Sequence, residues 1–548
     1  MRRHFACVLL IVVGALTAAA DDTPPAEPAL VLTLSNVDSA LRDVDDLLRA
    51  GNAPQYADFV RGLIEGLNDL RGIDRTRPLA GMLFLHRDDP EHKPSPLICL
   101  PVSDIPALRT TVAATGNTLE PTDDVRVYQL RLGKDDFRLL LVEGYAFLTA
   151  VEAPPPAYSP ERLLTVIEES AAGADLSLRF RRGGIPEVQI GKLLAEFDAD
   201  AARELTPRPD EGDEDYRLRA DLQRSVFDLL RLVVLEGEEL AVLLDVNVDR
   251  PLTAQATFRV REGGELGPWL RKTLTRPKRL NPPAEPLPAL RFQAAGNLSE
   301  RGRDISRRGL ALLRRGVLQE LGPQVPVDVL EQVERAIEAI DSTLAAGTLE
   351  TRLEFLPTPA GRFVLLGGFA VEQAEAIDGV IRSLIPLAAA SGDVARAEVE
   401  SFRINELTFH RVQGNESRDR DRKLYGADLA LSLAAGGEAV WLAVGGAETA
   451  IVLADLMAPP DESDGPHAPV TLSLRLGPWI EFAAREGGAR EQTVARLAGE
   501  LLSAGDSIEV ELSPDANGLQ LSVSVDESYV RLASKLAILR AQQQRKAE

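Results

Sequence analysis

The feature that most constrains the fold is an order of strands and helices that recurs along the chain. In the stretch LETRLEFLPTPAGRFVLLGGF, Leu349, Leu353 and Phe355 alternate with other residues, and a turn at 357–361 leads into a returning strand. Apolar residues at helical spacing precede this hairpin at 330–340 and follow it at 374–385. A short strand, PALRFQA, comes before the first helix. The unit is therefore predicted as strand, helix, hairpin, helix (β-α-β-β-α).

Similar orders begin near residues 30, 175, 289 and 471, which predicts about four β-α-β-β-α repeat units. Asn517-Gly518 is the clearest hairpin signal, because both residues tolerate the positive φ of a tight turn. Strands that alternate in this way bury one face, which is typical of antiparallel sheets covered by helices. The predicted class is α+β, with the four units arranged as two similar halves.

The predicted domain boundaries follow from this pattern and from the proline content. The first half is expected at 21–275 with a strand-rich insert at 117–173, and the second at 289–548 with a strand-rich insert at 389–469. Between them, 276–288 is proline-rich and typical of a linker. The acidic stretch 206–216 is predicted to be an exposed loop.

The tetrapeptide LGPW occurs twice, at 266–269 and 476–479, each time where a predicted strand leads into a helix. Pro268 and Pro478 suit the first turn of a helix, where the missing N–H costs nothing. Trp269 and Trp479 are then expected to lie over the sheet in a structural role. A ligand-stacking role for the two tryptophans is the alternative.

The N-terminus has the three parts of a secretory signal peptide at 1–20: the basic MRRH, an apolar core and Ala18-Ala19-Ala20. Cleavage before Asp21 would give a soluble exported protein, periplasmic or secreted, with no transmembrane segment. Cys99 is then the one remaining cysteine, and its apolar surroundings predict a buried residue in place of a reactive thiol.

The formal net charge of −23 argues against nucleic acid as a partner. One segment departs from this balance, because Arg301, Arg308 and Arg315 repeat every seven residues. A solvated helix face is the favoured interpretation, and a stripe that binds an anion or a partner is the alternative.

Catalytic motifs are scarce: the chain has no GxxxxGK[ST], HExxH, CxxC or GxSxG pattern. The segment LHRDDPEHKP gathers His86, Asp88, Asp89 and His92, which could bind a divalent metal if the turn folds back. A solvated polar turn is favoured there. No cofactor is predicted, and His410 and His467 complete the histidines of the mature chain.

In its signal peptide, its arginine-rich acidic composition and its βαββα-like units, the chain resembles uncharacterised exported proteins of planctomycete-type bacteria. The resemblance implies no functional residue. The leading hypothesis is a non-catalytic binding or scaffolding protein whose partner is a protein or a small apolar ligand. The alternatives are a lipid or apolar-ligand carrier with a cavity between sheet and helices, and a carboxylate-dependent hydrolase.

Overall fold

The computed structural model describes residues 27–536 except 51–53, 86–93, 134, 152–158, 210, 247–250, 275–279, 281–286, 322–324, 393, 416–417, 457–467, 503–505, 530 and 534. The chain forms two compact units. Unit 1 comprises Met1–Arg203, Leu229–Gly264 and Val525–Glu548, and unit 2 comprises Glu204–Asp228 and Glu265–Ser524.

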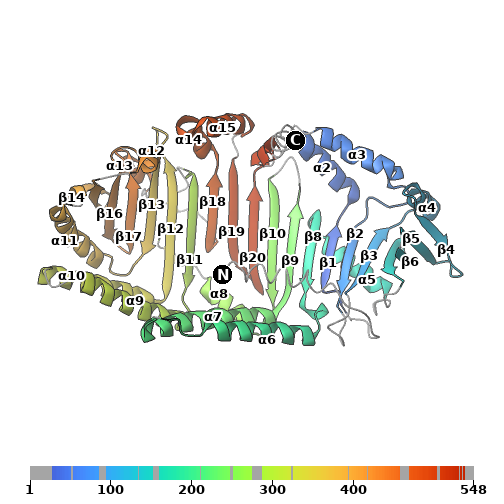
Figure 1. Ribbon diagram of the computed structural model, residues 1–548, viewed down its shortest axis with the longest axis horizontal. Helices are drawn as coiled ribbons and strands as arrows, with labels where there is room; N and C mark the ends of the chain where they lie inside the picture. Colours follow the sequence, from blue (N-terminus) through green and yellow to red (C-terminus); the bar gives the residue numbers. More distant parts are fainter. Residues whose placement is uncertain are drawn as a thin grey trace. The chain divides into compact units, whose positions relative to one another are not determined.

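The strands of unit 1 pair antiparallel in the order β4-β5-β6-β7-β3-β2-β1-β8-β9-β10 (Figure 1). Their bounds are β1 Leu30–Leu34, β2 Leu79–Phe84, β3 Ser95–Pro101, β4 Thr118–Pro121, β5 Val127–Leu132, β6 Asp135–Val142, β7 Tyr145–Ala150, β8 Leu176–Arg181, β9 Gly237–Asp245 and β10 Leu252–Val260. The strand-rich insert predicted at 117–173 contains β4 to β7.

The helices that connect these strands are α2 Val37–Ala50, α3 Pro54–Gly66, α4 Ile105–Ala114, α5 Pro160–Ala171 and α6 Glu187–Glu204, with short 3-10 turns η1 Asn68–Leu70 and η2 Arg182–Gly184. Helix α7, Asp213–Glu236, begins in unit 2 and ends in unit 1. The predicted loop at 206–216 is thus wrong in its last four residues. The acidic residues Asp213, Glu214 and Asp215 form the first turn of α7, where negative charge favours a helix.

The strands of unit 2 pair in the order β14-β15-β16-β17-β13-β12-β11-β18-β19-β20. Their bounds are β11 Leu290–Asn297, β12 Thr348–Pro357, β13 Phe363–Ala370, β14 Val394–Ile404, β15 Leu407–Gly414, β16 Ala430–Gly436, β17 Ala439–Gly445, β18 Val470–Arg475, β19 Ser507–Asp515 and β20 Gly518–Val525. The helices are α8 Leu266–Thr273, α9 Glu300–Leu321, α10 Val327–Ala346, α11 Glu375–Ser391, α12 Asp419–Tyr425, α13 Thr449–Leu456, α14 Gly477–Glu486 and α15 Ala489–Leu501. The fold is therefore α+β with antiparallel strands, as predicted.

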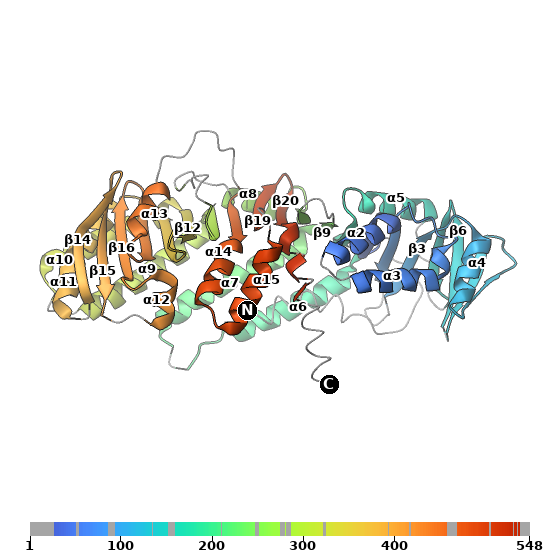
Figure 2. The ribbon, with the colours of Figure 1, turned by 90° about the horizontal axis from the view of Figure 1, so that it is seen from above.

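The main core of unit 1 lies between α5 and one face of the central strands. Val31, Met82 and Leu97 of the strands pack against Leu163 and Ile167 of α5. A second cluster, on the other face, packs α4 against β4 to β7. Figure 2 shows α5 on the opposite side of the strands from α2 and α3.

The alternating apolar residues that predict the strands of unit 1 lie on a face of these strands that remains partly exposed to solvent. In β1 the alternating residues Leu30, Leu32 and Leu34 are half-buried or exposed, whereas the residues between them are buried. Leu32, Ile98 and Leu240 are 44%, 42% and 39% exposed. Helices thus cover this face only in part. The largest buried cluster of unit 1 lies on the opposite face, where α5 packs against the strands.

In unit 2 the closely covered face of β12 is partly ionic. Arg352 and Glu354 are 2% and 0% exposed, while Leu349 on the other face is 44% exposed. Glu354 accepts hydrogen bonds from Arg291 Nε at 2.5 Å and from an Arg352 terminal nitrogen at 3.0 Å. The N–H of Leu280, within the predicted linker, donates to Glu350 at 2.9 Å. Within 276–288, the structure describes Leu280, Leu287 and Pro288, and the rest lies outside the described residues.

Both copies of LGPW open a helix, α8 and α14. Pro268 is the third residue of α8 and Pro478 the second of α14, so each proline lies in a first turn. The side chain of Trp479 stacks on Phe363 with ring centroids 4.5 Å apart, and its Nε1 donates to the carbonyl of Ala289 at 3.2 Å. Trp269 is half-buried at the start of α8.

Among the described residues, no helix is long and apolar enough to cross a bilayer. The predicted signal peptide at 1–20 lies outside the described residues.

Candidate functional site

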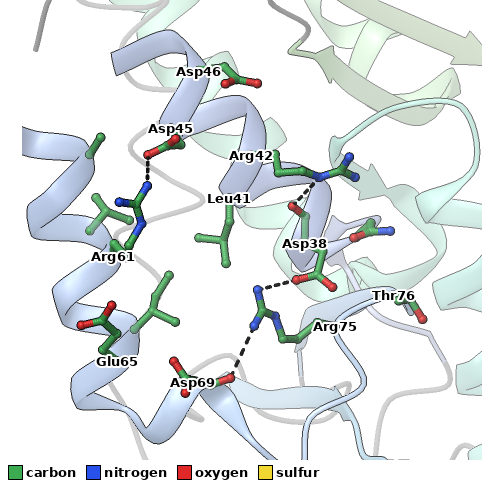
Figure 3. A pocket seen from close by; sticks show the side chains of 14 residues that line it. Asp38, Leu41, Arg42, Asp45, Asp46, Arg61, Glu65, Asp69, Arg75 and Thr76 are labelled. Carbon is green, nitrogen blue, oxygen red and sulfur yellow. Dashed lines mark hydrogen bonds and ion pairs between the residues drawn. The ribbon is translucent and has the colours of Figure 1, made fainter. Parts of the chain in front are cut away.

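A cavity of about 670 Å³ lies in unit 1 between helices α2 and α3 and the segment that follows α3 (Figure 3). This volume is within the range of small-molecule binding sites. Its lining comes from Asn36, Asp38, Leu41, Arg42, Asp45, Asp46, Ala57, Val60, Arg61, Ile64, Glu65, Asp69, Arg75 and Thr76.

The sequence around α2 explains why this helix begins where it does and how it is oriented. The Asn36 side chain accepts a hydrogen bond from the Ser39 N–H at 2.9 Å, which satisfies one donor of the first turn. Val37, Leu41 and Val44 recur at helical spacing, while the positions between them are mostly charged. An amphipathic helix of this kind presents an apolar stripe to the structure below it, and Val37 is buried.

The floor of the cavity is apolar. Leu41 of α2 faces Ala57, Val60 and Ile64 of α3 across it, and Figure 3 shows the Leu41 side chain pointing into the space between the helices. Ala57 is 2% exposed, whereas Val60 and Ile64 are half-buried. The floor can therefore take up the apolar part of a ligand.

The walls of the cavity carry ion pairs that join its sides. Arg61 of α3 reaches Asp45 of α2 at 3.1 Å, which bridges the two helices. Arg75, from the segment after η1, forms an ion pair with Asp38. Arg42 Nε donates to the backbone carbonyl of Asp38 at 3.3 Å.

Asp45, on one wall of the cavity, carries a fixed negative charge. Hydrogen bonding from Arg49 lowers the pKa of Asp45, so this carboxyl stays ionised at neutral pH. A general acid needs the opposite shift. Thr76 supplies the one hydroxyl of the lining, and it donates to Asp74 at 2.7 Å. This arrangement can bind and orient a ligand.

His410 is the one histidine among the described residues, and it is buried in unit 2. Its Nε2 lies 2.9 Å from Asp378 Oδ1, and its Nδ1 accepts the N–H of Glu400 at 3.1 Å. Because Nδ1 accepts, Nε2 carries the proton and donates to the carboxylate. Both ring nitrogens are occupied, so the imidazole ties α11 to β15.

The arginine stripe of α9 is neither an open anion site nor a merely solvated face. Arg301 and Arg308 pair with Asp228 and Asp221 of α7 at 2.5 and 2.6 Å, and Arg315 pairs with Glu214. The acidic partners also recur every seven residues, in the reverse direction. On its other side, α9 is tied to α10 by Arg307–Asp341 at 2.7 Å and Arg314–Glu334 at 2.6 Å. The stripe therefore holds neighbouring helices together.

The remaining predicted residues divide between buried and undescribed positions. Cys99 is fully buried, and burial raises its pKa to about 12, which fits the expectation of an unreactive thiol. The segment with His86, Asp88, Asp89 and His92 lies outside the described residues, as does His467. Within the described part of the chain, no group of three or more His, Cys, Asp or Glu residues is arranged to hold a metal ion.

The cavity residues were not predicted from the sequence. Residues 37–50 and 54–66 show helical spacing, but nothing in that pattern indicates that the two helices stand apart. Comparisons of the chain with protein families, with characterised proteins and with solved structures find no match.

Proposed function

We propose that this protein is an exported, non-catalytic binding protein that takes up a small amphipathic molecule between α2 and α3. The observation that carries the proposal is the cavity of about 670 Å³ with an apolar floor and charged walls. An apolar floor supplies affinity through burial, and fixed charges at the rim orient the ligand.

Carriage of a lipid or another apolar ligand is the second candidate. It is supported by the open apolar face of the unit 1 strands, where Leu32, Ile98 and Leu240 each expose more than a third of their surface. Ile98 of β3 and Leu32 of β1 lie in register on either side of Gly81 of β2, and apolar surface gathered in this way is typical of interaction sites. The carboxylate-dependent hydrolase is disfavoured, because arginines bind Asp38 and Asp45 and the pKa of Asp45 is lowered.

We also propose that the chain consists of two similar halves. From β1 to β10 and from β11 to β20 the strands pair in one order, each strand corresponding to the one ten numbers later. Helix pairs occupy matching places, with α2–α3 between β1 and β2 and α9–α10 between β11 and β12. We take this correspondence as support for two similar halves, each containing two β-α-β-β-α units. Export remains part of the proposal and predicts a mature N-terminus at Asp21.

Extraction of the purified protein with organic solvent, followed by mass spectrometry, tests the binding proposal. We expect a retained small molecule that is lost when Ile64→Trp fills the cavity from its floor. Val44→Trp is the matched control, because Val44 lies on α2, is 39% exposed and does not line the cavity. Equal retention in the wild type and in Ile64→Trp would refute the assignment of the cavity as the binding site.

A further inference from the structure

We infer that the ligand of the α2–α3 cavity is an organic cation with a short apolar body, bound with its charged group at the end of the cavity that holds Glu65 and Asp69. This inference rests on the proposed binding function and specifies the class of ligand. It is argued from the charge balance of the lining, the position of the charges and a comparison with a second helix pair of the same chain.

The lining is negative overall. It contains five carboxylates and three guanidinium groups, which leaves a net charge of two negative. Arg61 and Arg75 are each engaged with a lining carboxylate, Asp45 and Asp38. Arg42 donates to the backbone carbonyl of Asp38, so an anion could approach it without breaking an ion pair, but the anion would meet the net negative charge of the lining. A cation would not meet this repulsion.

The uncompensated charge is concentrated at one end. Figure 3 places Asp46 at one end of the cavity and Glu65 with Asp69 at the other. Among the residues that the structure describes, the side chains of Glu65 and Asp69 form no ion pair. The guanidinium group of Arg75 is paired with Asp38 and donates to the backbone carbonyl of Asp69 at 3.5 Å.

The apolar floor determines the rest of the ligand. Val60 and Ile64 are half-buried and lie one turn apart on α3, and Ile64 directly precedes Glu65. A cation bound at Glu65 would thus extend its apolar part over Ile64 and Val60 toward Leu41. A purely inorganic cation would leave this surface exposed to water, so the combination favours an amphipathic amine.

The helix pair α9–α10, in the matching place of unit 2, shows what such a pair is like when it is closed. There, Arg307–Asp341 and Arg314–Glu334 join the helices at two successive levels. Val329, Val333 and Ala336 of α10 are buried beneath them. Between α2 and α3 two ion pairs also cross, Arg61–Asp45 at 3.1 Å and Arg49–Asp58 at 3.9 Å, but the described side chains of α3 include one buried residue, Ala57. The two helix pairs therefore differ in how many side chains they bury and not in the number of crossing ion pairs.

Titration of the full mature chain with octylammonium, octanol and octanoate at low ionic strength tests the inference, with calorimetry as the readout. We expect octylammonium to bind most tightly, and the double variant Glu65→Gln/Asp69→Asn to weaken it by about tenfold, since each exposed charge contributes modestly. Asparagine suits position 69, whose φ of 55° lies in the left-handed region. Glu168→Gln, which removes an exposed carboxylate of α5 that does not line the cavity, is the control and should change binding less than twofold.

The outcomes separate this inference from the proposed function. If octanol or octanoate binds as tightly as octylammonium and Ile64→Trp abolishes that binding, the cavity is a ligand site but the cation assignment is wrong. If octylammonium binds equally to the wild type and to the double variant, the placement of the charged group is wrong. If none of the three probes binds, the inference fails, and the extraction experiment decides separately whether the cavity holds another ligand.

Discussion

The buried triad Arg291–Glu354–Arg352 gives the sharpest prediction about stability. Glu354 is fully buried and is the one carboxylate that both guanidinium groups are shown to contact. Glu354→Ala would remove this carboxylate from the buried Arg352 and from Arg291, whose side chain is 15% exposed, and burial already lowers the pKa of Arg352. Removal of one partner from a buried ionic network costs about 3–5 kcal/mol, because a desolvated charge loses a group that compensates it. We expect unit 2 to lose that much free energy of unfolding.

Tryptophan fluorescence during urea denaturation is a suitable assay, because all three tryptophans, at 269, 441 and 479, lie in unit 2. For a slope of about 3 kcal/mol per molar urea, the midpoint should fall by about 1–2 M. The control is the triple variant Arg291→Met/Glu354→Leu/Arg352→Met, which removes the three charges of the triad and should stay near the wild-type stability. A loss below about 1 kcal/mol in Glu354→Ala would show that the charges are solvated, and would refute the reasoning.

Three further predictions concern other parts of the chain. Trp479→Ala should lower the free energy of unfolding of unit 2 by about 2–4 kcal/mol, since it removes a ring stacked on its neighbours, and the urea midpoint measures this. Hydrogen bonds from arginines lower the pKa of Asp221 and Asp341 in the folded protein. Their contribution to the free energy of unfolding is therefore present above about pH 4, the pKa of the unfolded state, and is lost as the pH falls through the lower pKa of the folded state. Urea midpoints should therefore decrease below about pH 4 in the wild type and less in Asp221→Asn; an equal decrease would contradict this. Cys99 should react with a thiol reagent at pH 8 only after denaturation, and rapid reaction of the native protein would contradict its burial.

The sequence predicted the positions of the strands better than it predicted which face of each strand is buried. Alternation over 252–260 matches β10, and the turn between β19 and β20 lies at Ala516-Asn517, one residue before the predicted Asn517-Gly518. Alternation cannot tell which of two faces is covered, because that depends on elements distant in the sequence. Thus β12 was assigned by Leu349, Leu353 and Phe355, although its closely covered face carries Arg352 and Glu354.

The candidate site could not be predicted for a similar reason. A cavity arises from the separation of two helices, and separation is set by packing that local patterns do not encode. The heptad spacing of Arg301, Arg308 and Arg315 was visible, but their partners on α7 became identifiable only when the two helices were seen side by side. The metal hypothesis at His86 and His92 stays a prediction.

The ion pairs between α9 and α7 affect how the alignment of the two helices along one another is determined. The charged residues recur every seven positions on both helices. Sliding α9 along α7 by seven positions would therefore lose one terminal ion pair, and the remaining charges would form two pairs again. Ionic contacts of this kind are thus nearly degenerate between two alignments. The two buried side chains of α9, Ile305 and Leu310, are five apart and do not share the sevenfold interval. Aliphatic burial, although it involves few atoms here, must therefore select the alignment that the charges then secure.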